Sequence, residues 1–200
     1  MYHDINPNNF ELFKNQILNI KKDGWKFIDP KNLHKLVKKK IIGKKIILTF
    51  DDGFYSNILL ERKILQKLNI KAAFFIPTDF ICAKSRSESI KFVKNKLKLK
   101  NFQNNKLKRI NMNVKDIIEL YNRKHTIGNH TKSHIEFSKQ IILKKIRNEI
   151  IQINNKDLKK IINKSLFFSY PFGRIKDITY QSLNIVFKNY KFIFLGIRGN

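Results

Sequence analysis

Acidic and imidazole side chains follow two short apolar runs in this 200-residue sequence. Asp51 and Asp52 come directly after one run, and His130 and His134 follow another. Two adjacent carboxylates repel each other, so at least one of them favours a cation or a proton. The spacing of His130 and His134 is one helical turn, which would put both imidazoles on one face, a common geometry for a divalent metal. The pattern therefore predicts a metal site built from these residues.

A site with one carboxylate and two imidazoles would leave positions on the metal open, as a catalytic site requires. The second carboxylate would then be free to accept a proton from water. Taken singly these signals are weak, because Asp-Asp-Gly is by default a turn and a lone His-x3-His pair is more often solvated. Their order along the chain and their positions after apolar runs make the combination specific.

Apolar runs typical of strands alternate along the chain with amphipathic stretches typical of helices. Helices are predicted after Pro7 and Pro30 and over 58–68, 114–121, 137–162 and 178–187, and strands over 46–50, 72–76, 126–128, 166–170 and 191–195. This alternation indicates parallel βα units, and the continuously apolar strands indicate a sheet covered on both faces. We expect one α/β domain over 1–200, with the Lys-rich stretch 84–111 as an insertion or loop. Ligand-binding groups of such folds gather where strands end.

The net charge of +27 would ordinarily suggest nucleic acid or an anionic membrane surface as a partner. However, the sequence has 35 Lys and only 7 Arg, together with 32 Ile and 23 Asn, and the codons of Lys, Ile and Asn are all AT-rich. A nucleic-acid-binding protein would tend to be richer in Arg, whose planar group binds phosphates and guanines. We therefore attribute the charge to coding bias and expect no nucleic-acid partner.

Targeting signals are not visible in the sequence. The first residues lack the basic and apolar regions of a signal peptide, and no stretch approaches the ~18 apolar residues that cross a bilayer. Cys82 is the single cysteine, so it cannot form an internal disulfide. The sequence as written therefore predicts a soluble, cytoplasmic protein without a transmembrane segment.

Three segments resemble the first three motifs of the polysaccharide deacetylases, the NodB-homology domain of carbohydrate esterase family four. They are ILTFDDG at 47–53, HTIGNHTKSH at 125–134 and SYPFG at 169–173. The regions around Trp25 and 69–75 are similar to that family as well, so the resemblance covers most of the chain. It implies a deformed (β/α) barrel and metal-dependent removal of acetyl groups from an N-acetylated glycan.

Carried over by position, the resemblance implies roles for individual residues. Asp51 would be the general base, and Asp52, His130 and His134 would bind one divalent metal, usually zinc, with cobalt or nickel as alternatives. Phe172 stands where the family often has Tyr, and its backbone N–H would donate to the oxyanion. Because that role needs only the main chain, the change to Phe costs little.

Three further residues of the motifs are expected to support the site. Thr131 lies between the two histidines, and we expect its hydroxyl to brace the loop that carries them. Tyr170 and Pro171 belong to the third motif and are expected to contact the site or the substrate.

Two departures from the family pattern bear on activity. Many members have an arginine two residues before the third-motif proline, where it orders the catalytic aspartate, and this chain has Ser169 there. The later motifs, including a Leu-x-His that supplies the general acid, are absent, and the sequence ends after the fifth predicted strand. We therefore expect an incomplete barrel whose general acid is not identified by the motifs, with His3, near the mouth, as the candidate for a substitute.

Other functions stay open beside a metal-dependent deacetylase. A truncated, catalytically weak or silent barrel would bind glycan or metal without turnover, and a basic nucleic-acid-binding protein would rest on charge alone. An incomplete barrel also leaves an unpaired sheet edge, so a homodimer or a partner chain that covers this edge is expected. Because many family members act outside the cytoplasm, action at the cell envelope is the alternative location.

Overall fold

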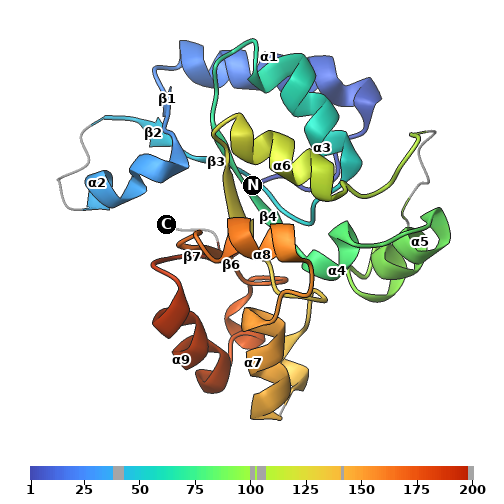
Figure 1. Cartoon of the computed structure of the whole chain (residues 1–200). Coiled ribbons are helices and arrows are strands. Elements are labelled where there is room, and N and C mark those ends of the chain that lie inside the picture. The colour runs from blue at the N-terminus through green and yellow to red at the C-terminus, as the bar shows by residue number, and fades with distance from the viewer. Residues whose placement is uncertain (38–42, 100–101, 103–106, 141, 198–200) are drawn as a thin grey trace.

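A five-stranded parallel sheet forms the centre of the computed structural model, which describes residues 1–37, 43–99, 102, 107–140 and 142–197 (Figure 1). The strands run in the order β3-β4-β5-β6-β7, and every neighbouring pair is parallel. Their bounds are Leu48–Phe50, Ala72–Ile76, Thr126–Asn129, Phe167–Ser169 and Phe192–Phe194. The α/β class is thereby confirmed, and the sheet is an open half-barrel whose strands follow one another in chain order.

A second, two-stranded parallel sheet pairs β1 (Lys26–Phe27) with β2 (Lys45–Ile46). The predicted strand 46–50 is therefore divided between two sheets. Nine α-helices occur in the described residues: α1 Phe10–Lys22, α2 Leu33–Val37, α3 Tyr55–Leu60, α4 Thr78–Ile81, α5 Arg86–Asn95, α6 Val114–Asn122, α7 Leu143–Ile151, α8 Lys156–Ile162 and α9 Tyr180–Asn189. The 3-10 helices are Pro7–Asn9, Pro30–Asn32, Phe137–Lys139 and Ile175–Asp177, and Glu61–Leu65 is a π-helix that continues α3.

Two further predicted segments differ from the structure. The predicted helix 137–162 is divided into the 3-10 helix Phe137–Lys139, α7 and α8, and α8 begins separately because the side chain of Asn155 accepts hydrogen bonds from the N–H groups of Asp157 and Leu158. The stretch 84–111 is not a loop throughout, since the Ser85 side chain accepts from the Glu88 N–H and begins α5. Residues 100–101 and 103–106 of that stretch lie outside the described residues.

The helices pack on the outer face of the sheet in two groups. In Figure 1, α1, α3 and α6 lie together over one side of the strands, and α7 and α9 lie together beyond β6. Phe74 points into the first of these layers, where its ring stacks on Phe50 with centroids 5.0 Å apart. The next residue, Phe75, points to the inside of the barrel and contacts Phe194, with ring centroids 5.0 Å apart. Both faces of β3 to β6 are therefore buried, as their continuously apolar sequences predict, and the edge strand β7 is half-buried.

The N-terminal residues lie alongside β3 and extend the sheet. The Tyr2 N–H donates to the Thr49 carbonyl at 2.9 Å, and the Asp51 N–H donates to the Tyr2 carbonyl at 2.9 Å. This parallel bridge between Tyr2 and Phe50 brings His3 to the carboxyl end of β3.

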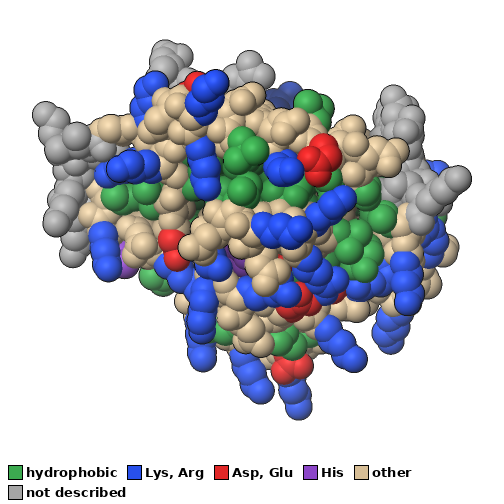
Figure 2. Space-filling view, turned by 90° about the horizontal axis from the view of Figure 1, so that it is seen from above, with side chains coloured by type: hydrophobic (Ala, Val, Ile, Leu, Met, Phe, Trp, Pro, Cys, Tyr) green, Lys and Arg blue, Asp and Glu red, His purple; other side chains and the backbone are tan. Residues whose placement is uncertain are grey.

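Two surface properties bear on possible partners. Among the described residues, none of the helices is both long and apolar enough to cross a bilayer. On the face seen from above, the Lys and Arg side chains are scattered rather than gathered into one patch (Figure 2).

The barrel interior depends on the absence of a side chain at Gly128. A Cβ atom placed there would lie 2.3 Å from Cδ1 of Phe75. Gly128→Ala should therefore lower the free energy of unfolding by about 1–3 kcal/mol, measured by urea denaturation, because the methyl group must displace the Phe75 ring. Adding Phe75→Leu should restore part of this loss. Equal stability of Gly128→Ala and the wild type would contradict the packing.

Candidate active site

The predicted site residues meet at the carboxyl ends of the parallel strands. Asp51 and Asp52 follow β3, His130 follows β5, and Phe172 follows β6. A cavity of about 310 Å³ opens there, and its lining includes His3, Asp51, Asp52, His130, His134 and Phe172. The parallel arrangement of the strands thus brings Asp51 and Phe172, which are 121 residues apart in the sequence, to one pocket.

The two imidazoles meet through a turn, so the prediction that they share a helical face is wrong. Residues 132 and 133 form a bend, and the flanking Thr131 and His134 have φ of 66° and 53°. The turn follows β5 directly, and the His130 N–H still donates to the Ile76 carbonyl at 3.2 Å. Reversal of the chain after this bond brings the two rings within 4.9 Å, centroid to centroid.

Asp52, His130 and His134 point three buried ligand atoms at one another. Asp52 Oδ1 lies 3.6 Å from His130 Nε2 and 3.4 Å from His134 Nε2. The other ring nitrogens are engaged by carbonyls, His130 Nδ1 by Ser169 at 2.7 Å and His134 Nδ1 by Lys96 at 3.2 Å. A carbonyl only accepts, so each Nδ1 carries a proton, and in the neutral form of each ring Nε2 presents a lone pair.

This arrangement fits a metal ion. Asp52 Oδ1 is buried and has no hydrogen-bond partner among the described residues, and it faces two lone pairs. Three converging electron-rich atoms in a buried site need a cation to offset their repulsion and lost hydration. The carbonyl partners of both histidines are the outer contacts that orient metal-binding imidazoles.

The pKa values of the three groups suit this role. Burial lowers the pKa of His134 to about 4, so that ring is neutral near pH 7. Burial opposes ionisation of Asp52, but the imidazoles of His130 and His134 outweigh it and hold the pKa of Asp52 below its usual value. Burial would also lower the pKa of His130, but the carboxylates of Asp52 and Asp51 outweigh burial and raise it. A proton on His130 and a metal ion are thus alternative ways to satisfy the same carboxylates.

Asp51 is buried beside this group and is oriented by Ser169. Its Oδ2 accepts a hydrogen bond from Ser169 Oγ at 3.2 Å, while Oδ1 has no partner among the described residues. Burial raises the pKa of the Asp51 carboxyl and the charge of Asp52 adds to the rise, although His130 opposes it. Ser169 stands where an arginine was expected, and its hydroxyl and carbonyl contact Asp51 and His130 respectively.

Phe172 presents its main chain at the edge of the cavity. Its φ is 62°, and its N–H has no hydrogen-bond partner among the described residues. The ring packs edge-on against His134 at 4.7 Å, with Lys98 Nζ over its face at 4.8 Å. Gly173 follows with φ of 66°, and a Cβ there would lie 2.3 Å from the Gly196 nitrogen. Glycine is needed at that position to let the loop approach the end of β7.

The remaining predicted residues take different places. Thr131 is buried, and its Oγ1 accepts from the Ile135 N–H at 3.4 Å, which closes the loop between the histidines. Tyr170 lines the cavity, and its hydroxyl donates to Ser182 Oγ at 3.4 Å. The Pro171 carbonyl accepts from the Gly173 N–H at 2.7 Å, so Pro171 shapes the turn. His3 is exposed at the mouth of the cavity.

Two contributors were missed in the sequence. Lys96 contacts His134 through its carbonyl, a group that every residue has, so no sequence signal could have found it. Glu149, on α7, accepts hydrogen bonds from Ser133 in the loop between the histidines. Its signal is a carboxylate on the same helical face as Ile146 and Ile150, which are buried in the core.

Comparison with protein families gives a match whose range contains Asp51, Asp52, His130, His134 and Phe172. The model of the family described as "Polysaccharide deacetylase" matches residues 38–186. No curated protein is similar enough in sequence to count as a match.

Several solved structures share the fold. A Streptococcus pyogenes deacetylase, PplD, solved in complex with acetate, is 20% identical with a TM-score of 0.68, over 94% of this chain and 77% of that one. IcaB from Ammonifex degensii is 18% identical with a TM-score of 0.70, over 97% and 81%. BC0361, a polysaccharide deacetylase from Bacillus cereus, is 18% identical with a TM-score of 0.68, over 100% of this chain and 57% of its own. The half-barrel is therefore that of the deacetylase (β/α) barrels.

One divalent metal per chain is expected at Asp52, His130 and His134. His130→Ala and His134→Ala should each remove it, because each substitution deletes one of three ligands. Elemental analysis after equilibration with zinc or cobalt and removal of free metal measures the ratio. His34→Ala, which removes an exposed imidazole elsewhere, is the control and should retain the metal. Full retention in a His130→Ala, His134→Ala double variant would contradict the assignment.

Proposed function

Because this chain belongs to the polysaccharide deacetylase family, whose members are hydrolases that deacetylate glycans, we propose that it removes N-acetyl groups from an amino-sugar polymer or glycan precursor with the help of one divalent metal. The observation that carries this proposal is the buried group of Asp51, Asp52, His130 and His134 at the floor of an open cavity. Two carboxylates in different environments beside two imidazoles suit hydrolysis of an amide.

Asp52, His130 and His134 would hold the metal. When bound, a divalent ion polarises a carbonyl oxygen and lowers the pKa of water, which is the chemistry that an amide hydrolase needs. One carboxylate with two imidazoles suits zinc, and cobalt and nickel accept the same donor types.

Asp51 would be the general base. As the oxygen of the attacking water bonds to the acetamide carbon, Asp51 accepts the proton that this water loses. Burial supports the role, because it raises the pKa of Asp51 and so makes its carboxylate a stronger base. The hydrogen bond from Ser169 Oγ to Oδ2 orients the carboxylate and leaves Oδ1 for the water.

The Phe172 N–H and His3 would complete the reaction. Negative charge develops on the former carbonyl oxygen, and the Phe172 N–H, which has no partner in the described part of the chain, is available to donate a hydrogen bond to it. When the C–N bond breaks, the amine needs a proton, and His3 at the mouth of the cavity is the candidate donor. The products are acetate and the free amino sugar.

Separate substitution of Asp51 and Asp52 by asparagine distinguishes the proposed roles of the two carboxylates. Asp51→Asn should retain the metal and lower acetate release from N-acetylglucosamine oligomers by about 10²–10⁴-fold, because only the base is lost. Asp52→Asn should instead release the metal. Loss of metal in Asp51→Asn together with retention in Asp52→Asn would show that the two assignments are reversed.

His3→Gln tests the proposed acid. It should retain the metal and lower kcat by about 10²-fold or more, because the departing amine must then take its proton from water. His34→Gln serves as the matched control and should leave kcat unchanged. If His3→Gln keeps the full wild-type kcat, His3 is not the acid. Metal binding by the wild type without any acetate release would favour a silent barrel.

A further inference from the structure

The loop between His130 and His134 has a backbone that is costly to maintain. Thr131 and His134 both have φ in the left-handed region, at 66° and 53°. For residues other than glycine, such a conformation costs about 1–3 kcal/mol each and persists only where surrounding contacts stabilise it. The positions of both imidazoles therefore depend on what holds the loop.

Helix α4 holds the loop from one side. The Thr78 N–H donates to the Thr131 carbonyl at 3.3 Å, and the Asp79 N–H donates to the Lys132 carbonyl at 2.9 Å. These bonds satisfy carbonyl groups of the loop and leave its N–H groups to be satisfied from elsewhere.

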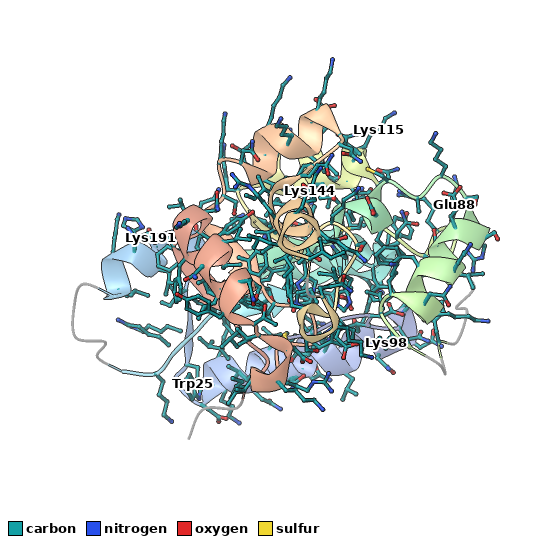
Figure 3. All side chains as sticks on the ribbon, turned by 90° about the horizontal axis from the view of Figure 1, so that it is seen from below. Trp25, Glu88, Lys98, Lys115, Lys144 and Lys191 are labelled. Carbon is teal, nitrogen blue, oxygen red and sulfur yellow. The ribbon has the colours of Figure 1, made fainter. Side chains whose placement is uncertain are left out.

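Helix α7 holds the loop from the other side, through Glu149. The Ser133 N–H donates to Glu149 Oε2 and the Ser133 hydroxyl to Oε1, both at 2.8 Å. The Lys132 N–H donates to the Glu149 main-chain carbonyl, also at 2.8 Å. Seen from below, α7 lies in front of the sheet, with Lys144 labelled near its beginning (Figure 3). One residue of α7 thus accepts three hydrogen bonds from two consecutive loop residues.

The carboxylate of Glu149 has no other evident purpose in the fold. It is 9% exposed, and among the described parts of the chain no cation forms an ion pair with it. Ile146 and Ile150, on the same face of α7, pack in the apolar core. A buried carboxylate is costly unless hydrogen bonds satisfy it, and among the described residues both of its oxygens are satisfied by Ser133.

We propose that Glu149 is a positioning residue that fixes the loop carrying His130 and His134 in the conformation that binds metal. This inference rests on the metal site of the proposed function. Ser133 lies immediately before His134 and three residues after His130, so movement of Ser133 displaces His134 Nε2 from Asp52 Oδ1. Glu149 contacts neither ligand, and it acts through Ser133 on the affinity of the site.

Glu149→Gln tests the proposal because it keeps the size of the side chain and removes its charge. Cobalt binding, followed by absorption in competition with a chelator, should weaken by about 10-fold. This is the lower end of the range for losing a group that bonds a metal ligand directly, because Glu149 acts one residue away, through Ser133. Asp157→Asn is the control, since it neutralises an exposed carboxylate of α8, and it should bind cobalt like the wild type.

A double-mutant cycle separates positioning from general destabilisation. Ser133→Ala should weaken cobalt binding less than Glu149→Gln, and the double variant should bind like Glu149→Gln alone, because both changes act on one contact. If circular dichroism shows that Glu149→Gln is unfolded, Ser133→Ala decides: weaker cobalt binding by a folded Ser133→Ala chain supports the proposal, and unchanged binding overturns it.

The outcomes distinguish this inference from the function on which it rests. Cobalt affinity within twofold of the wild type in a folded Glu149→Gln chain would overturn the positioning role and leave the metal site intact. Absence of cobalt binding by the wild type would overturn the metal site, and the positioning role with it.

Discussion

The repulsion among three buried, electron-rich atoms is the constraint on which this site depends. Asp52 Oδ1 faces His130 Nε2 and His134 Nε2 at 3.6 and 3.4 Å, and both imidazoles are held in the tautomer that presents a lone pair. Such an arrangement is unfavourable without a cation or a proton, and folding does not relieve it, because neighbouring carbonyls fix the rings. The site therefore lowers the free energy of unfolding of the metal-free protein, and binding of a metal ion would raise it.

The parallel sheet is what makes this arrangement attainable. Adjacent strands β3, β4, β5 and β6 deliver the carboxylates, helix α4, the histidine loop and the Phe172 turn to the same edge. Alternation along β4 places Phe74 under the outer helices and Phe75 inside the barrel, so this strand is buried on both faces. Ser169 at the end of β6 then links two parts of the site, since its hydroxyl contacts Asp51 and its carbonyl contacts His130.

Strand periodicity and motif order predicted the sheet and the residues gathered at its edge. Strands 72–76 and 126–128 lie where predicted, because buried parallel strands need continuous apolar runs and are ended by Pro77 or by polar residues. The helical spacing of His130 and His134 led to a wrong prediction of a shared helical face. Thr131 and His134 instead adopt left-handed backbone conformations, which tertiary contacts impose and which the sequence does not predict. The same limit applies to Lys96, whose carbonyl carries no sequence signal.

X-ray absorption at the cobalt edge of the cobalt-loaded chain tests the central claim most directly, because it counts the imidazoles bound to the metal. The account predicts a first coordination shell of nitrogen and oxygen that contains two imidazoles, and one imidazole fewer in His134→Ala if any cobalt is retained. A shell of oxygen atoms without imidazole scattering, or a spectrum unchanged by His134→Ala, would contradict the site described for Asp52, His130 and His134.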